Sequence, residues 1–337
     1  MTGISIRAGN GYPERGQLRH RSCVNLDLET EKIEILLATF QSEKFLSEQI
    51  DSILSQTDPN WTLLIRDGGS SDSTPEIIDR YVRRDPDRIR FLGSSRTSAC
   101  KNFSLLLEAA RAELVMPCDH DDVWLPEKIA LTRKRYIEEY RKNPPGTPIL
   151  IFSDLRIVDE DLNLISPSLM RYSKLRPDRL SLSRLLVQNV PQGNTMLLNS
   201  ALRKLVHPIP AEAVMHDSWI ALTAAAFGRI GYLEESTILY RQHNGNVFGA
   251  FRYSVAFFMK KISEGRKKLL LRWDMNVRQA QAFLECNRSR LAPEEIRMLT
   301  RFSSIGRAGF FKKRYILIRY KILKTGFIRN LGIFLII

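Results

Sequence analysis

The feature that most constrains the fold of this chain is a regular alternation of apolar runs and helical patterns that begins at Ile33. Runs of strand length occupy residues 33–39, 62–65, 88–92 and 113–116, and helical spacing or helix-start signals occupy residues 45–54, the stretch after Ser73, and 101–110. This alternation predicts an α/β fold with a largely parallel sheet that helices cover on both faces. Further on, short strands are expected at 149–152 and 196–198, and helices near 179–189 and 217–227.

Polar residues follow the predicted strands at the points where these strands end. Thr39 ends the first, Asp67 ends the second, and the cluster Asp119-His120-Asp121-Asp122 follows the fourth. Ligands of open α/β sheets bind beyond the carboxyl ends of the strands. The sequence therefore predicts a ligand site built from these residues.

Composition excludes several classes of protein. With 44% apolar residues among 337, the chain can bury a sizeable core, and its four cysteines lack the spacing of a disulfide framework or a zinc site, so a reducing compartment fits. No apolar run approaches the ~20 residues of a membrane-spanning helix, and we expect no signal peptide. The net charge of +14 is uneven: residues 251–337 hold 20 Lys or Arg and five Asp or Glu, while the first 250 are nearly neutral.

Two loops have the residue types of a nucleotide and metal site. Asp119, Asp121 and Asp122 repel one another, and a cation such as Mg²⁺ or Mn²⁺ would relieve this, although the loop could also only cap the next helix. The turn at 66–74 contains Gly-Gly-Ser-Ser, which lets the backbone approach a ligand. Its alternative is an ordinary strand-to-helix turn with Asp72 or Ser73 as the N-cap.

Two later segments also combine polar groups with an element end. Asp217 precedes the apolar stretch 220–227, so it would lie at a helix N-terminus, as a functional carboxylate or as a simple cap. Residues 240–246 cluster polar groups after an apolar strand and include His243, whose role is structural or ligating.

Together these four segments resemble the bacterial family 2 glycosyltransferases of the GT-A fold, in particular the rhamnosyltransferase-like group. The resemblance runs from about Ile33 to Phe248, with weaker similarity at 324–332. It includes the Thr39-Phe40 pair and the helix after it. The family's nucleotide loop is usually Asp-Asp-Gly-Ser-Ser-Asp, and here Gly68 replaces the second Asp, which commonly reads the base. The base would then be held by Asp67, or by backbone and Thr39 alone.

The resemblance implies a role for individual residues. The residues expected to bind the donor are Thr39, Phe40, Asp67, Lys101 and Asp119; those expected at the metal, Mn²⁺ or Mg²⁺, are Asp121, Asp119 and His243; those expected beside the acceptor are Gln192, Gly193, Asn194 and Trp219. Asp217 falls on the position of the family's general base. Arg241 or Gln242 could serve the donor phosphates in place of a ligating His243.

The resemblance also implies an activity, a location and a domain order. We expect a metal-dependent, inverting hexosyltransferase that moves a sugar from dTDP-rhamnose or a UDP-sugar to a glycan or lipid-linked acceptor during surface polysaccharide (O-antigen) synthesis. We expect it in the cytoplasm, peripheral on the inner face of the plasma membrane. The domain order would be a flexible leader at 1–30, a GT-A domain at 31–249 with a nucleotide-binding half (31–125) and an acceptor half (126–249), and a basic helical region at 250–337.

The basic region raises a second reading of the whole chain. An inactive GT-A core could serve as a basic polyanion- or membrane-binding protein, although no specific nucleic acid is expected. In the first reading, Phe311, Tyr315, Ile318 and Ile322 line one face of a helix that lies on an anionic membrane surface. The alternative is a helix that packs this face on the domain.

Overall fold

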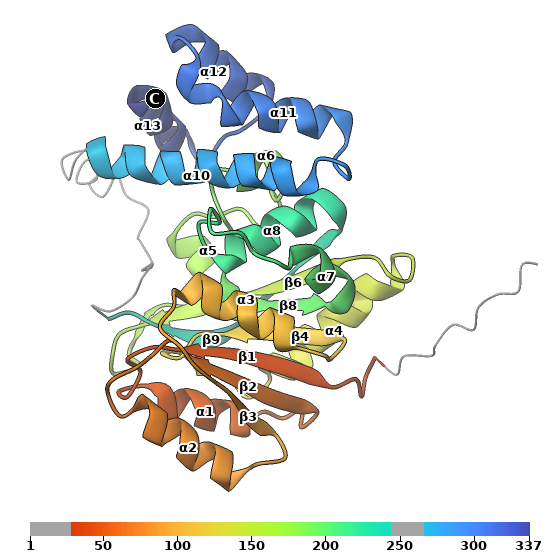
Figure 1. Ribbon diagram of the computed structural model, residues 1–337, viewed down its shortest axis with the longest axis vertical. Coiled ribbons are helices and arrows are strands. Elements are labelled where there is room, and N and C mark those ends of the chain that lie inside the picture. The colour runs from red at the N-terminus through yellow and green to blue at the C-terminus, as the bar shows by residue number, and fades with distance from the viewer. Residues whose placement is uncertain (1–27, 244–265) are drawn as a thin grey trace, which may run out of the picture.

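The computed structural model describes residues 28–243 and 266–337 (Figure 1). Its strands form one mixed sheet in the order β3-β2-β1-β4-β8-β6-β9-β5, with β7 paired to β6. The strands are β1 Ile33–Thr39, β2 Trp61–Asp67, β3 Ile89–Ser94, β4 Leu114–Cys118, β5 Val123–Trp124, β6 Ile149–Val158, β7 Leu164–Ser166, β8 Met196–Asn199 and β9 Arg229–Arg241.

The sheet is parallel in its first half and mixed in its second. β1 pairs in parallel with β2 and β4, and β2 pairs in parallel with β3. β8 then lies antiparallel between β4 and β6, and β6 pairs in parallel with the long strand β9. The predicted fold class, a doubly covered mixed α/β sheet of GT-A type, is therefore confirmed, although less of the sheet is parallel than simple alternation suggests.

Helices cover both faces of the sheet, as the two-sided burial of its strands requires. The helices up to β9 are α1 Leu46–Leu54, α2 Thr74–Arg84, α3 Ala99–Ala109, α4 Lys128–Arg141, α5 Leu169–Tyr172, α6 Leu182–Leu185, α7 Ser200–Val206 and α8 His216–Phe227, with a 3-10 turn, η1, at Gly193–Thr195. One core lies with α1, α2 and α4, and the other with α3, α7 and α8. Alternate residues of β1 enter opposite cores: Ile35 the first and Leu36 the second.

The described part of the basic region is helical. It consists of α10 Arg266–Asn287, α11 Pro293–Ser303, α12 Phe310–Arg319 and α13 Phe327–Ile336, with a 3-10 turn, η2, at Ile305–Arg307. Phe283 of α10 packs edge-on against Trp219 of α8, which joins this region to the α8 side of the core. In Figure 1, α10 lies between the sheet domain and α11, α12 and α13.

Two local expectations differ from the structure. The helix expected near 179–189 is only the four-residue α6, and the apolar residues after it, Leu186 and Val187, are buried outside the helix. Ile322 does not extend the apolar face of α12, since that helix ends at Arg319 and Ile322 is fully buried. The leader expected at 1–30 falls almost entirely outside the described residues, as does residue 248, and the proposed domain boundaries stay predictions. In the described ranges, no helix has both the length and the apolarity to cross a membrane.

Candidate active site

The candidate site lies at the carboxyl ends of β1, β2 and β4. Thr39 is aligned with Asp67 across the β1–β2 pair, and Leu37 is aligned with Cys118 across the β1–β4 pair. The three strands are parallel, so they end at one edge of the sheet, and the residues after them emerge together. This brings the nucleotide loop and the acidic loop to the same place, as the sequence predicted.

Asp67 is buried and organises the nucleotide loop. Its Oδ1 accepts hydrogen bonds from the hydroxyls of Thr39 (2.9 Å) and Ser70 (2.6 Å), and its Oδ2 accepts from the Gly69 and Ser70 N–H groups and from the Ser94 hydroxyl. Burial alone would raise the pKa of Asp67, but the hydrogen bonds outweigh it and the pKa is lowered. A carboxylate has about four lone-pair sites, so these five donors use its capacity. Asp67 therefore shapes the loop, and its expected role in holding the nucleobase stays a prediction.

The position of Gly68 lies against Phe40. The Gly68 N–H donates to the Thr39 carbonyl (2.8 Å), and an added Cβ would lie 3.2 Å from that carbonyl oxygen and 3.4 Å from the Phe40 side chain. Phe40 is 54% exposed, which leaves its ring accessible beside the loop. An exposed aromatic ring offers a flat apolar surface on which a planar base can stack.

Lys101 lies in the first turn of α3 and is exposed to solvent. Its N–H donates to the Ser98 hydroxyl, the N-cap of the helix, and the next residue, Asn102, donates its amide to the Arg66 carbonyl (3.0 Å). These bonds fix the start of α3 to the end of β2. Lys101 therefore lies at a helix N-terminus, where the helix dipole also favours an anion.

The acidic loop carries more negative charge than the surrounding protein balances. The pKa of Asp119 is raised to about 8 by burial and by the charges of Asp121 and Asp217, and the pKa of the fully buried Asp122 is raised well above its usual range by burial and by Asp121 and Asp119. Carboxylates so placed favour a nearby cation. This imbalance fits the divalent metal that the sequence predicts.

The three carboxylates have different partners. Asp122 accepts from the Asn194 amide and from the Arg241 N–H, so it ties the acidic loop to η1 and to the end of β9. The Asp121 Oδ2 lies 2.9 Å from Nε2 of His243. Within the described ranges, no group of three or more His, Cys, Asp or Glu residues is arranged to hold a metal ion. Asp121 and His243 are thus adjacent groups of types that can ligate a metal, and the charge of Asp121 acts on the neighbouring Asp119.

Arg241 organises this edge of the site. Its Nε donates to the Asp121 carbonyl (3.0 Å), its guanidinium pairs with Glu48 of α1, and the guanidinium lies over the Phe45 ring at 4.4 Å from the centroid. The same ring lies 5.0 Å from the His243 ring. Sequence reasoning considered Arg241 only as a phosphate ligand, whereas the buried side chain holds the acidic loop.

Asp217 lies in the first turn of α8 and faces the loop before η1. Its Oδ2 accepts from the Asn189 amide (3.0 Å), and its Oδ1 accepts from the Ser218 N–H (2.6 Å). Burial raises its pKa to about 6, while the hydrogen bonds from Ser218 and Asn189 oppose that rise. The carboxylate is separate from the Asp121–His243 pair, yet its charge is felt by Asp119. Sequence reasoning missed Asn189, because nothing in the local pattern marks it.

The predicted acceptor-side residues divide into two groups. Gly193 and Asn194 form η1 against the start of α8, where a Cβ on Gly193 would lie 2.6 Å from Nε2 of His216, and Gln192 precedes them. The structure places Trp219 elsewhere: it is buried, its indole N–H donates to the Val206 carbonyl, and it packs on α10. Trp219 is therefore a core residue and not part of the acceptor side.

Lys128 is fully buried and contacts η1. Sequence reasoning also missed this residue. Its ammonium donates to the Asn194 carbonyl (3.1 Å) and lies 4.6 Å from the centroid of the Trp124 ring. Burial lowers its pKa to about 7, although the neighbouring Cys118 and Asp122 act in the opposite direction. Lys128 is the first residue of α4, where a lysine is ordinarily expected to be exposed to solvent.

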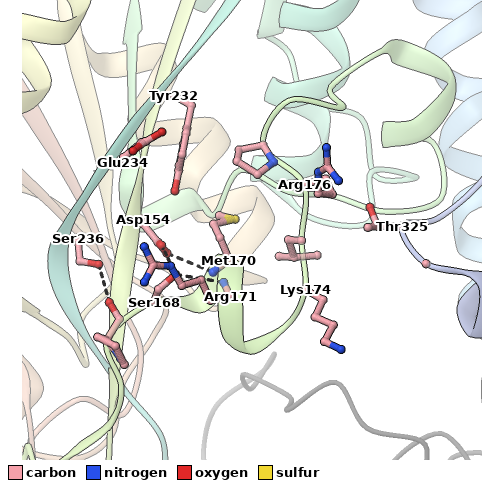
Figure 2. A pocket seen from close by; sticks show the side chains of 14 residues that line it. Asp154, Ser168, Met170, Arg171, Lys174, Arg176, Tyr232, Glu234, Ser236 and Thr325 are labelled. Carbon is pink, nitrogen blue, oxygen red and sulfur yellow. Dashed lines mark hydrogen bonds between the residues drawn. The ribbon is translucent and has the colours of Figure 1, made fainter.

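A separate cavity of about 780 Å³ lies between β6, α5, β9 and the segment before α13, and Figure 2 shows its lining. Its wall combines apolar surface from Met170, Leu175 and Tyr232 with charged groups such as Arg171 and Glu234. Buried Asp154 holds the α5 end of this wall by accepting the N–H groups of Leu169 and Met170. The volume and the mixed lining suit an organic ligand of moderate size.

The fold defines a class: it has the GT-A architecture of glycosyltransferases, with two polar loops at the carboxyl ends of a doubly covered sheet. Among solved structures, residues 1–349 of S. aureus TarS, in complex with UDP-GlcNAc, match with a TM-score of 0.54 and 16% identity over 86% of this chain and 73% of that one. The mannosyltransferase PcManGT from Pyrobaculum calidifontis, in complex with GDP-Man and Mn²⁺, matches with a TM-score of 0.50 and 14% identity over 90% and 78%.

The sequence itself identifies the family. Residues 34–205 match the family described as glycosyl transferase family 2, and the chain belongs to that family. A curated relative, the uncharacterized glycosyltransferase alr2836 from a Nostoc species, is 26% identical over 222 residues. The match covers 64% of this chain and 66% of that relative.

Proposed function

We propose that this family 2 glycosyltransferase is a metal-dependent, inverting hexosyltransferase that moves one sugar from a nucleotide-diphosphate donor to a glycan or lipid-linked acceptor. The observation that carries the proposal is the position of Asp217, a carboxylate with a raised pKa that stands apart from the Asp121–His243 pair. A direct displacement needs one carboxylate that takes the proton of the acceptor and that is separate from the charged groups at the metal.

The donor would bind across the edge formed by β1, β2 and β4. Phe40 would stack on the base, the loop held by Thr39 and Asp67 would follow the nucleoside through its backbone, and Lys101 would face the phosphates. The nucleotide-diphosphate sugars in complexes with structural neighbours are UDP-GlcNAc and GDP-Man. We propose dTDP-rhamnose or a UDP-sugar here, because the sequence resembles the rhamnosyltransferase-like group.

Asp121 and His243, with Asp119, would hold a Mn²⁺ or Mg²⁺ ion. Mg²⁺ is commonly bound through one or two carboxylates plus substrate phosphates, so two or three protein ligands suffice. When bound, the cation neutralises the charge of the departing diphosphate. The uncompensated charge of the acidic loop supports this assignment, and the Mn²⁺ in the PcManGT complex is consistent with it.

The chemistry assigned to this chain's own residues is one proton transfer with a displacement. Asp217 takes the proton of the acceptor hydroxyl, the hydroxyl oxygen forms a bond to the anomeric carbon, and the bond from that carbon to the diphosphate oxygen breaks. The diphosphate leaves with the electron pair. Attack from the side opposite to the leaving group inverts the anomeric centre.

The acceptor would approach along Gln192, Gly193 and Asn194, and we assign its distal sugars to the cavity beside α5. Thr325 lines the cavity, and its N–H donates to the side chain of Gln188 (2.6 Å), the sequence neighbour of Asn189. One hydrogen-bonded segment thus joins the cavity wall to the Asn189–Asp217 pair, and we propose that the acceptor spans the distance between them. We propose surface polysaccharide synthesis in the cytoplasm, on the inner face of the plasma membrane, as the setting.

A thermal-shift panel of nucleotide sugars with Mn²⁺ tests the proposal. A ligand that binds only the native state at 100 times its Kd stabilises it by about 2.7 kcal/mol, so one donor should raise the Tm by several degrees. Asp121→Asn should remove the Mn²⁺-dependent part of that shift, and Asp79→Asn, an exposed ion-pair residue on α2, should not. A panel in which no nucleotide sugar raises the Tm would contradict the proposal.

A further inference from the structure

The end of the molecule formed by α12 and α13 exposes an unusual amount of apolar surface. On α12, Phe311, Tyr315 and Ile318 recur at helical spacing, and on α13, Phe327, Leu331 and Leu335 do the same. These six side chains are between 42% and 84% exposed. The opposite faces are used for packing, since Ile316 and Leu317 of α12 are buried. Both helices are therefore folded onto the protein and still present a second apolar face.

The two helices contact each other, so their exposed faces belong to one structural unit. Arg314 of α12 donates to the backbone carbonyls of Phe334 and Ile337 at the end of α13. Its guanidinium also lies over the Phe310 ring. A cation at a helix C-terminus is favourable for the helix dipole, which fixes this pairing. We call the six exposed side chains with Lys312, Lys313 and Lys321 the α12–α13 surface.

The charged residues of α12, of α13 and of the segment between them are all basic. Residues 310–337 contain seven Lys or Arg and no Asp or Glu. Lys312 and Lys321 are exposed and Lys313 is partly exposed, and none of the three forms an ion pair within the part of the chain that the structure describes. Arg319, the last residue of α12, does form an ion pair, a long one with Glu294 of α11 (3.9 Å). A protein partner with both acidic and basic residues on its surface would not require that the charged residues here all be basic.

We infer that the α12–α13 surface binds anionic lipid headgroups, with its aromatic and aliphatic side chains inserted at the membrane interface and its lysines on the phosphates. Apolar side chains beside unpaired cations are the combination that interfacial helices use on anionic membranes. Each Lys or Arg near such a surface adds to the electrostatic attraction, and aromatic rings contribute apolar area at headgroup depth.

This surface is connected to the candidate base. The segment between α12 and α13 contains Thr325, whose N–H donates to Gln188, and the adjacent Asn189 donates to Asp217. Docking through α12 and α13 would hold Asp217 at a fixed height above the bilayer, which suits an acceptor carried on a lipid. That consequence rests on the proposed function, whereas lipid binding itself does not.

Co-sedimentation of the full chain with vesicles tests the inference. We expect binding to phosphatidylcholine vesicles that contain phosphatidylglycerol, little binding to phosphatidylcholine alone, and weaker binding at high salt. Lys312→Glu with Lys313→Glu should lower the partition coefficient about tenfold or more, and Phe311→Ser with Phe327→Ser should do the same through lost insertion. These residues are exposed, so the fold should persist.

Matched controls change the same chemistry elsewhere. Lys134→Glu with Lys142→Glu alters the net charge equally, at exposed lysines in α4 and directly after it, and Leu164→Ser with Ile165→Ser removes two exposed apolar residues of β7; neither pair should weaken binding. Equal losses in the controls, equal binding to both kinds of vesicle, or no binding with a dimer that Phe311→Ser dissociates would overturn the inference. A donor-induced Tm shift, measured on the same variants, separates failure of the surface from failure of the proposed function.

Discussion

At the scale of single residues, the proposed reaction depends most on Asp217, the candidate base. If it is the base, Asp217→Asn should lower kcat by roughly 10²-fold or more with donor binding preserved. If it only stabilises the start of α8, Asn should serve nearly as well, at a cost of about 1 kcal/mol or less. Steady-state turnover and thermal unfolding of the same preparation distinguish the two. Glu76→Gln, which changes an exposed first-turn acid on α2, is the control.

Asn189 should set the pH at which Asp217 works. Burial raises the pKa of Asp217 to about 6, and the Asn189 amide opposes that rise because it donates to the ionised carboxylate. A base must be ionised, so activity should fall as the pH drops through this pKa. Asn189→Leu removes the donor, and the acid limb of the kcat profile should move to higher pH. An unchanged limb, with the same loss of rate at every pH, would mean that Asn189 is only structural.

At the scale of elements, the short turn η1 positions the site, and its contact with α8 is close. A Cβ on Gly193 would lie 2.6 Å from Nε2 of His216 and 3.4 Å from the Asp217 Cβ. Gly193→Ala should therefore displace either η1 or the start of α8, reduce kcat at least tenfold, and destabilise the protein by about 1–3 kcal/mol. Gly306→Ala has open space around it and should leave both unchanged. Chemical denaturation and turnover assays measure the two effects, and wild-type kcat in Gly193→Ala would refute this view of η1.

The sequence predicted elements well where local pattern suffices and poorly where distant pairing decides. The run from β1 to β4 was predictable because each strand or helix has its own periodicity and start signal. The antiparallel insertion of β8 between β4 and β6 depends on pairing between residues some 80 positions apart, for which a single sequence carries no local signal. Trp219 was misplaced for a similar reason, since only the packing of α10 makes its position part of the core.

For the candidate site, the types of its residues and their order along the chain were predictable, but their hydrogen-bond partners were not. Asp67 and Asp121 stand at strand ends, where the alternation of elements puts them, and the structure brings them to one edge. Asn189 and Lys128 come from segments with no recognisable signal and acquire their contacts only in the folded chain. The remaining assignments of site residues stay predictions.

At the scale of the whole molecule, we assign roles to three parts: the donor to the edge formed by β1, β2 and β4, the base to Asp217 on α8, and membrane contact to the basic helical end. The chain belongs to glycosyl transferase family 2 and has the GT-A fold, and the proposals concern its reaction, its metal, its stereochemistry and its location. Those proposals meet in one reaction, since the donor, the cation and Asp217 must act together on the acceptor. A test of the whole therefore has to observe transfer itself.

The most direct measurement is release of nucleoside diphosphate from a panel of nucleotide sugars, with an acceptor extract, and with NMR of the anomeric proton in the product. We predict turnover of one donor, loss of turnover in EDTA with recovery on addition of Mn²⁺, and a product whose anomeric configuration is opposite to that of the donor. Retention of the donor's configuration, or full activity in EDTA, would contradict the account.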